Sequence, residues 1–205
     1  MATPVWLDAM ISALENGKTD IVLGPVRAVY PDDAPEWMKK ADFHSAKPVW
    51  VDNEIRTGYA GNLLLKRASP SLQALRFRHD LGKAGGEDTM FLYAAYKAGA
   101  RIGYAQEAIA TEMVPHDRAR IGWLAKRQFR NGQTHGLFLM ENLGSGAKVR
   151  VKNIALASAK SAFCFAAMLP NLAKADRSSF WLLRGAMHAG VVARLLGARE
   201  LNQYG

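Results

Sequence analysis

Two long apolar segments near the C-terminus, both interrupted by basic residues, most constrain how this chain can fold. Residues 154–170, IALASAKSAFCFAAMLP, contain a single charge at Lys160, and residues 178–200 carry Arg184 and Arg194 among apolar neighbours. The first segment is at the short limit for a membrane span, which needs about 20 residues. Basic amphipathic helices bounded by Trp and Phe are typical of the membrane interface, and a helical pair packed on the protein's own core is the alternative.

The charge of the chain is divided unevenly along its length. Residues 1–117 hold 13 Lys and Arg against 15 Asp and Glu, whereas residues 118–205 hold 14 against 3, which together give the net charge of +9. A basic C-terminal part on a near-neutral body favours an anionic partner. Its basic residues alternate with long aliphatic runs instead of stacking aromatics, which argues against nucleic acid and leaves an anionic membrane surface as the favoured partner.

The rest of the chain alternates between helical and strand patterns, which indicates the α/β class. Helical patterns cover three segments: residues 5–20, 85–100 and 118–144. Strand patterns cover three others: residues 20–30, 57–67 and 101–114.

Two features interrupt this alternation. The first strand pattern is broken or bulged at Gly24-Pro25, and residues 31–54, rich in Pro and Asp, predict a long irregular loop with one helical turn. The single cysteine, Cys164, excludes an internal disulfide and fits a reducing location. We divide the chain into an α/β part, residues 1–145, and a basic, apolar helical part, residues 146–205.

The window GKAGGEDTMF places two glycines and two acids directly before an apolar run. Acids in the first turn of a helix interact favourably with its dipole, and glycines before a helix are ordinary turn residues, so the pattern by itself indicates capping. The alternative is a carboxylate that faces a cleft from the start of a helix and accepts a proton from an attacking hydroxyl.

The order of the segments favours the second interpretation. DIVLGPV, an acidic Pro-rich loop, TGYAGNLLLKR, GGEDTMFLYAAYKAGARIGYAQEA and KRQFRNGQ follow one another in an order that resembles bacterial family 2 glycosyltransferases of exopolysaccharide and cell-surface glycan assembly. The resemblance implies the later half of a GT-A-like mixed or parallel sheet, followed by C-terminal amphipathic helices. It also implies inverting transfer of a sugar from a nucleotide-sugar to a glycan or lipid-linked acceptor, with Asp88 as catalytic base and Glu87 as its neighbour.

The same resemblance gives binding roles to residues outside this window. Arg127 and Arg130 lie three residues apart, so they share a helical face and can grip a diphosphate, and Gln133 belongs to the same motif. A basic helix face that meets solvent or lipid headgroups is the alternative. Gly61 and Asn62 fall in the strand that the resemblance places at the floor of the acceptor pocket, where small residues let a substrate come close; sheet packing is the alternative.

A divalent metal, Mg²⁺ or Mn²⁺, is implied by the resemblance alone. Family members hold it with an Asp-x-Asp motif that this sequence lacks, and Glu112 and His116 are the alternatives for a later ligand. The nucleotide-binding first half of the family's domain is also missing. We therefore expect Met1 to be an internal methionine, and the chain alone to be inactive as a transferase.

These features together predict an enzyme at the cytoplasmic face of the inner membrane, bound peripherally or weakly integral. The alternative function is a non-catalytic module that docks on membranes or on partner enzymes.

Overall fold

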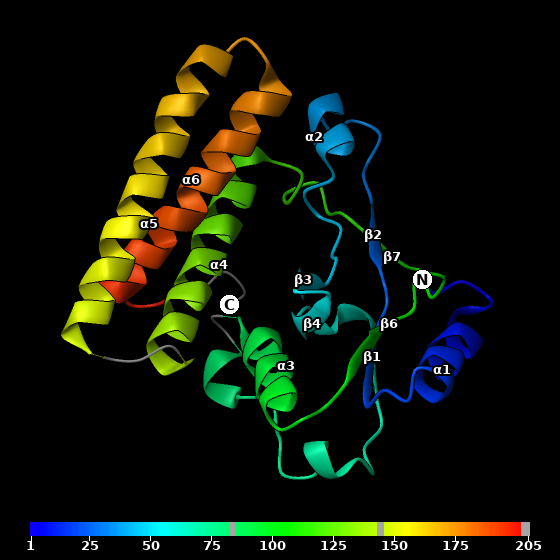
Figure 1. The fold of residues 1–205 in the computed structure, drawn as a ribbon. Helices are drawn as coiled ribbons and strands as arrows, with labels where there is room; N and C mark the ends of the chain where they lie inside the picture. Colours follow the sequence, from blue (N-terminus) through cyan, green and yellow to red (C-terminus); the bar gives the residue numbers. More distant parts are fainter. Residues whose placement is uncertain (83–84, 143–145, 202–205) are drawn as a thin grey trace. The chain divides into compact units, whose positions relative to one another are not determined.

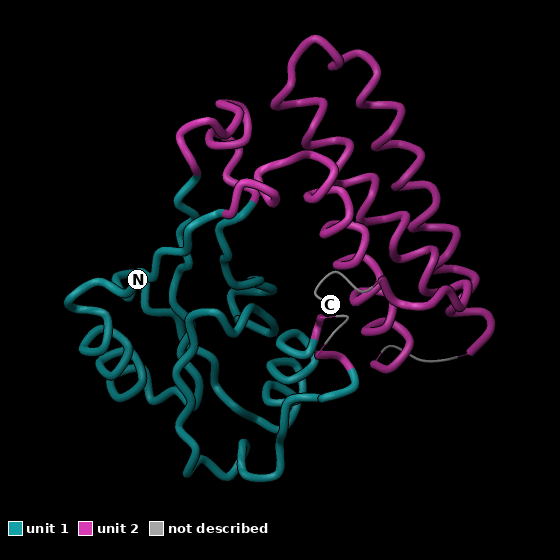
Figure 2. The backbone as a smooth tube through the Cα atoms, turned by 180° about the vertical axis from the view of Figure 1, so that it is seen from behind, with its two compact units in different colours: residues 1–30, 44–80, 87–114 teal, residues 31–43, 81–86, 115–205 magenta. Residues whose placement is uncertain are grey.

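A computed structural model describes residues 1–82, 85–142 and 146–201. The chain forms two compact units (Figure 2): unit 1 comprises residues 1–30, 44–80 and 87–114, and unit 2 comprises residues 31–43, 81–86 and 115–205. Small sheets of mixed direction lie in unit 1, and long helices follow in unit 2, so the predicted α/β class is confirmed. The predicted boundary between residues 145 and 146 lies next to 143–145, outside the described residues, and stays a prediction.

The centre of unit 1 is a short sheet with the strand order β5-β1-β6. Strand β1 (Ile21–Leu23) pairs antiparallel with β5 (Leu63–Leu65) and parallel with β6 (Ile102–Tyr104). All three residues of β1 are buried, which explains why its sequence is continuously apolar instead of alternating.

Two helices bury the opposite faces of β1. Ile21 and Leu23 pack in the same cluster as Phe91 and Leu92 of helix α3 (Glu87–Lys97). Val22 points the other way and packs with Met10 of helix α1 (Trp6–Asn16). The predicted helices at 5–20 and 85–100 are therefore confirmed.

The chain leaves the sheet at Gly24-Pro25, where the sequence predicted a break. Beyond it, β2 (Val26–Val29) pairs parallel with β7 (Ala110–Met113) in a separate two-stranded sheet. A Cβ on Gly24 would lie 2.6 Å from the carbonyl oxygen of Ala108, so only glycine fits.

The prediction of an irregular loop over residues 31–54 is only partly right. Helix α2 (Glu36–Ala41) supplies the expected helical turn, but β3 (Val49–Val51) and β4 (Glu54–Thr57) form an antiparallel hairpin that the prediction missed. Asp52 and Asn53 between the strands both have positive φ, 52° and 62°, as a two-residue type I′ turn requires.

Short 3₁₀ turns occupy several connections. They are η1 (Ala60–Asn62), η2 (Pro70–Leu72), η3 (His79–Leu81) and η4 (Leu169–Asn171). The strand predicted over residues 57–67 is shortened by η1, which leaves only the three residues of β5 in the sheet.

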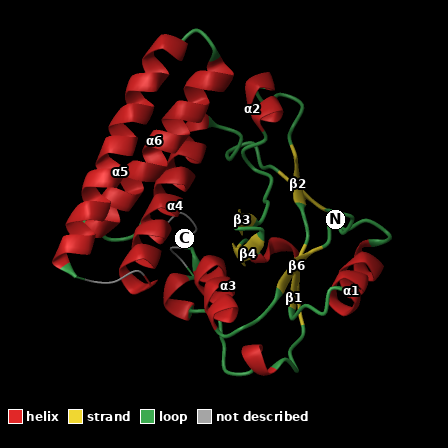
Figure 3. Cartoon of the chain, viewed as in Figure 1, coloured by secondary structure: helices red, strands yellow, loops and turns green. Residues whose placement is uncertain are grey.

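Unit 2 is built on the long helices α4 (Ile121–Asn142), α5 (Ala147–Met168) and α6 (Ala175–Leu195), which lie side by side (Figures 1 and 3). Glycines bring the backbones of α4 and α6 very close. A Cβ on Gly132 would lie 1.9 Å from the Met187 carbonyl oxygen, and one on Gly190 would lie 1.9 Å from that of Phe129. Small residues at such crossings let helices pack backbone to backbone.

Helices α5 and α6 also meet at a glycine, through side chains of α5. The Ser161 hydroxyl donates a hydrogen bond to the Gly185 carbonyl oxygen at 3.1 Å, and the ring of Phe165 lies against Gly185. Cys164 is buried on this face of α5. The apolar C-terminal segments therefore pack partly on the protein itself, through one face of α5.

Candidate active site

Glu87 and Asp88 form the first turn of α3, as the sequence predicted. Asp88 is half-buried, and its Oδ2 accepts a hydrogen bond at 3.0 Å from the backbone N–H of Ala60 in η1. Among the residues that the structure describes, Ala60 is the only hydrogen-bond partner of this side chain. The second oxygen, Oδ1, has no hydrogen-bond partner among these residues.

The η1 turn that anchors Asp88 lies at the carboxyl ends of the parallel strands β1 and β6. Leu63, the residue after η1, pairs with Leu23, which also pairs with Tyr104. In open α/β sheets, ligands bind in the crevice beyond the carboxyl ends of the strands. Asp88 is therefore held at the edge of the sheet where a substrate is expected.

Asn62 fixes this edge from beneath. Its side chain is buried; Nδ2 donates to the carbonyl oxygens of Pro25 and Ala108, at 3.0 and 2.7 Å, and Oδ1 accepts from Trp6 Nε1 at 2.8 Å. Every hydrogen-bonding group of the amide is therefore engaged by the protein. Gly61 is exposed, and a Cβ on it would meet only Val26, at an ordinary 3.7 Å.

Glu87 carries a buried oxygen that lacks a partner. Its Oε2 is inaccessible to solvent and accepts no hydrogen bond from the described residues, although the side chain as a whole is half-buried. A buried acceptor without a donor costs free energy.

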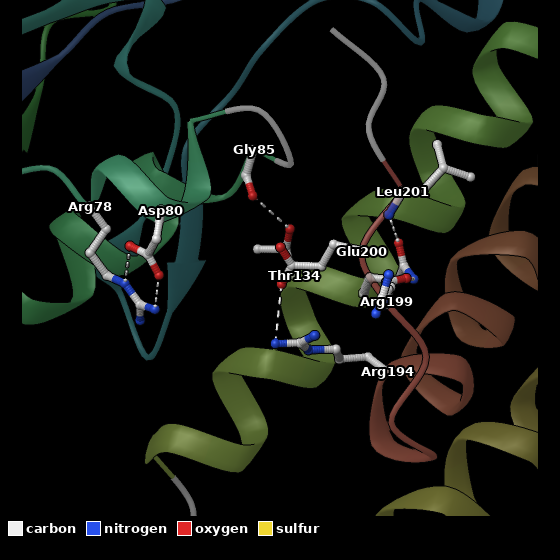
Figure 4. Close-up of polar contacts among 9 residues, drawn as sticks. Arg78, Asp80, Gly85, Thr134, Arg194, Arg199, Glu200 and Leu201 are labelled. Carbon is white, nitrogen blue, oxygen red and sulfur yellow. Dashed lines mark hydrogen bonds and ion pairs between the residues drawn. The ribbon is translucent and has the colours of Figure 1, made fainter. Parts of the chain in front are cut away.

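The two glycines before Glu87 are required by their surroundings in unit 2. Gly85 and Gly86 have positive φ, 78° and 103°. A Cβ on Gly85 would lie 1.6 Å from Arg130 Nη1, and one on Gly86 would lie 2.5 Å from Thr134 Cγ2. The Thr134 hydroxyl also donates to the Gly85 carbonyl oxygen at 3.5 Å (Figure 4). The positive φ and the close packing against α4 therefore both favour glycine at these positions, in addition to the ordinary turn preference that the sequence indicated.

The residues of the KRQFRNGQ motif have different surroundings in unit 2. Arg130 is 9% exposed, with its guanidinium against the Gly85-Gly86 turn. Gln133 is buried; its Nε2 donates to the Arg199 carbonyl oxygen and its Oε1 accepts from the Leu201 N–H, both at 2.9 Å. Figure 4 shows residues 199–201, which follow α6, and the ion pair between Arg194 of α6 and Glu200, at 3.2 Å.

Arg127 is the more accessible arginine of the motif. Its guanidinium lies 5.6 Å from the ring centroid of Trp123, and Arg118 lies at the same distance from that ring. Arg127 is half-buried, so it can reach an anion while its position is limited by the stacking.

The predicted residues belong to both units. Four of them, Glu87, Asp88, Gly61 and Asn62, lie in unit 1, whereas Arg127, Arg130 and Gln133 lie in unit 2.

The described ranges contain no group of three or more His, Cys, Asp or Glu side chains that could hold a metal ion. Glu112 is exposed on β7 of unit 1, and His116 lies in unit 2 with its Nδ1 3.1 Å from Asp33. The divalent metal therefore stays a prediction.

Comparison with known proteins gives one informative relative. No family model matches the chain, and no solved structure matches it. The chain is 48% identical over 200 residues to the succinoglycan biosynthesis protein ExoM of Rhizobium meliloti (strain 1021). The alignment covers 98% of this chain but 64% of the relative, so the chain spans less than two thirds of that protein. The chain is similar, over nearly its whole length, to a succinoglycan biosynthesis protein. This similarity confirms the predicted likeness to proteins of exopolysaccharide assembly.

Proposed function

We propose that this chain carries the acceptor side of an inverting, family 2 glycosyltransferase of exopolysaccharide assembly. The observation that carries the proposal is Asp88: a carboxylate at the start of α3, anchored through one oxygen to η1 at the carboxyl edge of the sheet. The similarity to a succinoglycan biosynthesis protein supports a substrate of the same general kind, a growing glycan.

In the proposed reaction, Asp88 Oδ1 accepts the proton of an acceptor hydroxyl. The hydroxyl oxygen forms a bond to the anomeric carbon of the nucleotide-sugar, and the bond from that carbon to the diphosphate oxygen breaks, so the nucleoside diphosphate leaves with the electron pair. Attack opposite the leaving group inverts the configuration of the anomeric carbon. The Ala60 N–H holds Oδ2 and orients the carboxylate, which is what a general base requires.

Glu87 has a supporting role in this proposal. Its carboxylate, half-buried in the first turn of α3, accepts a hydrogen bond from a second hydroxyl of the acceptor sugar, which orients the attacking group. A sugar presents several neighbouring hydroxyls, so two adjacent carboxylates can be engaged at once.

Arg127 is the residue that we assign to the diphosphate. It is accessible, whereas the guanidinium of Arg130 is packed against Gly85 and the amide of Gln133 is bonded to residues 199 and 201. Arginine stabilises the charge that develops on a departing diphosphate through paired N–H groups. The predicted divalent metal remains an implication of the resemblance, and no step here depends on it.

The proposal is tested with the protein that the complete native gene encodes, because we expect the 205-residue chain alone to be inactive. Membranes that contain it are incubated with a panel of nucleotide-sugars and lipid-linked acceptors, and both nucleoside diphosphate release and the linkage of the product are measured. We expect one donor to be used, with inversion at the anomeric carbon. Retention would contradict the role of Asp88, and the absence of turnover with every donor would favour a non-catalytic docking module.

A further inference from the structure

The end of the helical hairpin formed by α5 and α6 exposes a group of large apolar side chains. Phe163, Leu169 and Leu172 are 62–64% exposed, and Phe180 is 44% exposed. The Trp181 ring contacts two of these residues edge to face, Phe163 with a centroid separation of 5.7 Å and Phe180 with 5.2 Å. We refer to residues 160–184, where α5, η4 and α6 meet, as the hairpin end (Figure 1).

Exposed basic residues lie in the same segment as these apolar side chains. Within the hairpin end, Lys160, Lys174, Arg177 and Arg184 are all exposed, and Asp176 is the only acid. The Arg184 guanidinium lies 5.9 Å from the ring centroid of Phe180, so cation and aromatic ring share one surface.

A pocket of about 330 Å³ adjoins the same surface. Its lining includes two further residues of unit 2, Lys40 and Phe43, together with Asp176, Arg177, Phe180 and Trp181. Two cations against one carboxylate leave the pocket with a net positive charge beside three aromatic rings, which suits a phosphate group next to an apolar one.

Exposed apolar groups of this size mark a surface that something else covers. A membrane fits the chemistry better than a protein partner, because the centres of protein interfaces are depleted in lysine, whereas interfacial membrane segments combine basic residues with Trp, Phe and Leu. The excess of basic residues is complementary to anionic phospholipid headgroups.

Helix α5 is long and apolar enough to cross a membrane, yet a charge in its middle argues against a span. Ala157, Ser161 and Cys164 of α5 are buried, and Ser161 bonds to Gly185 of α6. Lys160 in the middle of α5 is exposed, so a crossing helix would place its charge in the hydrocarbon. We propose that the hairpin end inserts into the surface of an anionic bilayer, while α5 and α6 remain packed together and do not cross it.

The test compares two pairs of equally exposed residues on the same hairpin. Leu169→Ser with Leu172→Ser alters the hairpin end. Val151→Ser with Leu196→Ser alters the opposite end, where both residues are 64–66% exposed and Arg150 Nε donates to the Leu195 carbonyl oxygen. Each protein is floated with vesicles of phosphatidylglycerol and phosphatidylcholine, or of phosphatidylcholine alone, at low and high salt, after its helix content has been checked by circular dichroism.

We expect the parent protein and the Val151/Leu196 variant to bind the anionic vesicles at low salt and to be released at high salt. The Leu169/Leu172 variant should bind at least about tenfold more weakly than the parent protein, because two apolar side chains no longer enter the bilayer. Equal loss in both variants, unchanged binding of the Leu169/Leu172 variant, binding indifferent to salt and lipid charge, or no binding at all would each overturn the proposal. Membrane binding needs no turnover, so it fails or holds independently of the proposed transferase activity.

Discussion

The candidate active site in unit 1 and the helical bundle in unit 2 are held together in different ways. In unit 1, Asn62 connects Trp6, the Gly24-Pro25 break and Ala108 by hydrogen bonds that join residues far apart in the sequence. In unit 2, Gly132 and Gly190 let two helix backbones touch. The sheet edge that presents Asp88 thus depends on one buried amide whose hydrogen-bonding groups are satisfied, whereas the bundle depends on the absence of side chains where its helices cross.

The bundle should be the more sensitive to added volume. In Gly132→Ala, the new Cβ would lie 1.9 Å from the Met187 carbonyl oxygen, and backbone atoms cannot move aside locally. We expect a loss of about 3 kcal/mol or more in the free energy of unfolding, measured by urea denaturation. Gly122→Ala is the matched control on the same helix, since a Cβ there meets nothing within 4 Å; it should be neutral or stabilising by up to about 1 kcal/mol. Equal effects of the two changes would refute the close crossing.

The site should be the more sensitive to lost hydrogen bonds. Asn62→Ala leaves the carbonyl oxygens of Pro25 and Ala108 and the Trp6 Nε1 without partners in a buried place, so we expect a loss of about 2–3 kcal/mol. Asn16→Ala, which removes one bond to Ser12 on the exposed surface, should cost less than about 0.5 kcal/mol in the same urea titration. A small effect at Asn62 would mean that it does not organise the sheet edge.

A weaker effect is expected from pH, and between pH 5.5 and 7.5 it should come from the bundle. Burial lowers the pKa of His188 below its ordinary 6.5, and the charges of Lys160, Arg184 and His135 lower it further. The unfolded chain therefore binds more protons than the native one just below pH 6.5, so stability should fall as the pH drops from about 6.5 toward the lowered pKa. Lys160→Met removes one cause of the shift and should reduce this loss in urea titrations at pH 5.5 and 7.5. An unchanged pH dependence would exclude the contribution of Lys160.

Most of the secondary structure could be predicted because its signals are local. The spacing of apolar residues located α1, α3 and α4, and Gly24-Pro25 located the break between β1 and β2. The β3–β4 hairpin was missed because the Pro and Asp content of residues 31–54 indicated a loop, although Asp52-Asn53 is itself a favourable hairpin turn.

The surroundings of the predicted site residues were much harder to foresee. Asp88 is anchored by a backbone N–H, which any residue except proline would provide at position 60, so the residue type there does not indicate the contact. The KRQFRNGQ motif predicts a basic helical face, but Arg130 faces the Gly85-Gly86 turn and Gln133 faces the segment after α6. These contacts join distant parts of the chain, and local periodicity carries no information about them. The glycines at 132 and 136 were a visible signal of close helix packing that the sequence reading did not use.

The role of Asp88 is tested most directly by a pair of substitutions in the first turns of two helices. Asp88→Asn keeps the shape and an oxygen for the Ala60 N–H but removes the proton acceptor, whereas Asp8→Asn removes an exposed acid from the first turn of α1. Sugar transfer and urea denaturation are measured for both, with the protein expressed from its native gene. We predict that Asp88→Asn lowers the turnover number about 10²–10⁴-fold with little change in stability, and that Asp8→Asn retains full activity. Turnover by Asp88→Asn close to that of the parent protein would contradict the account.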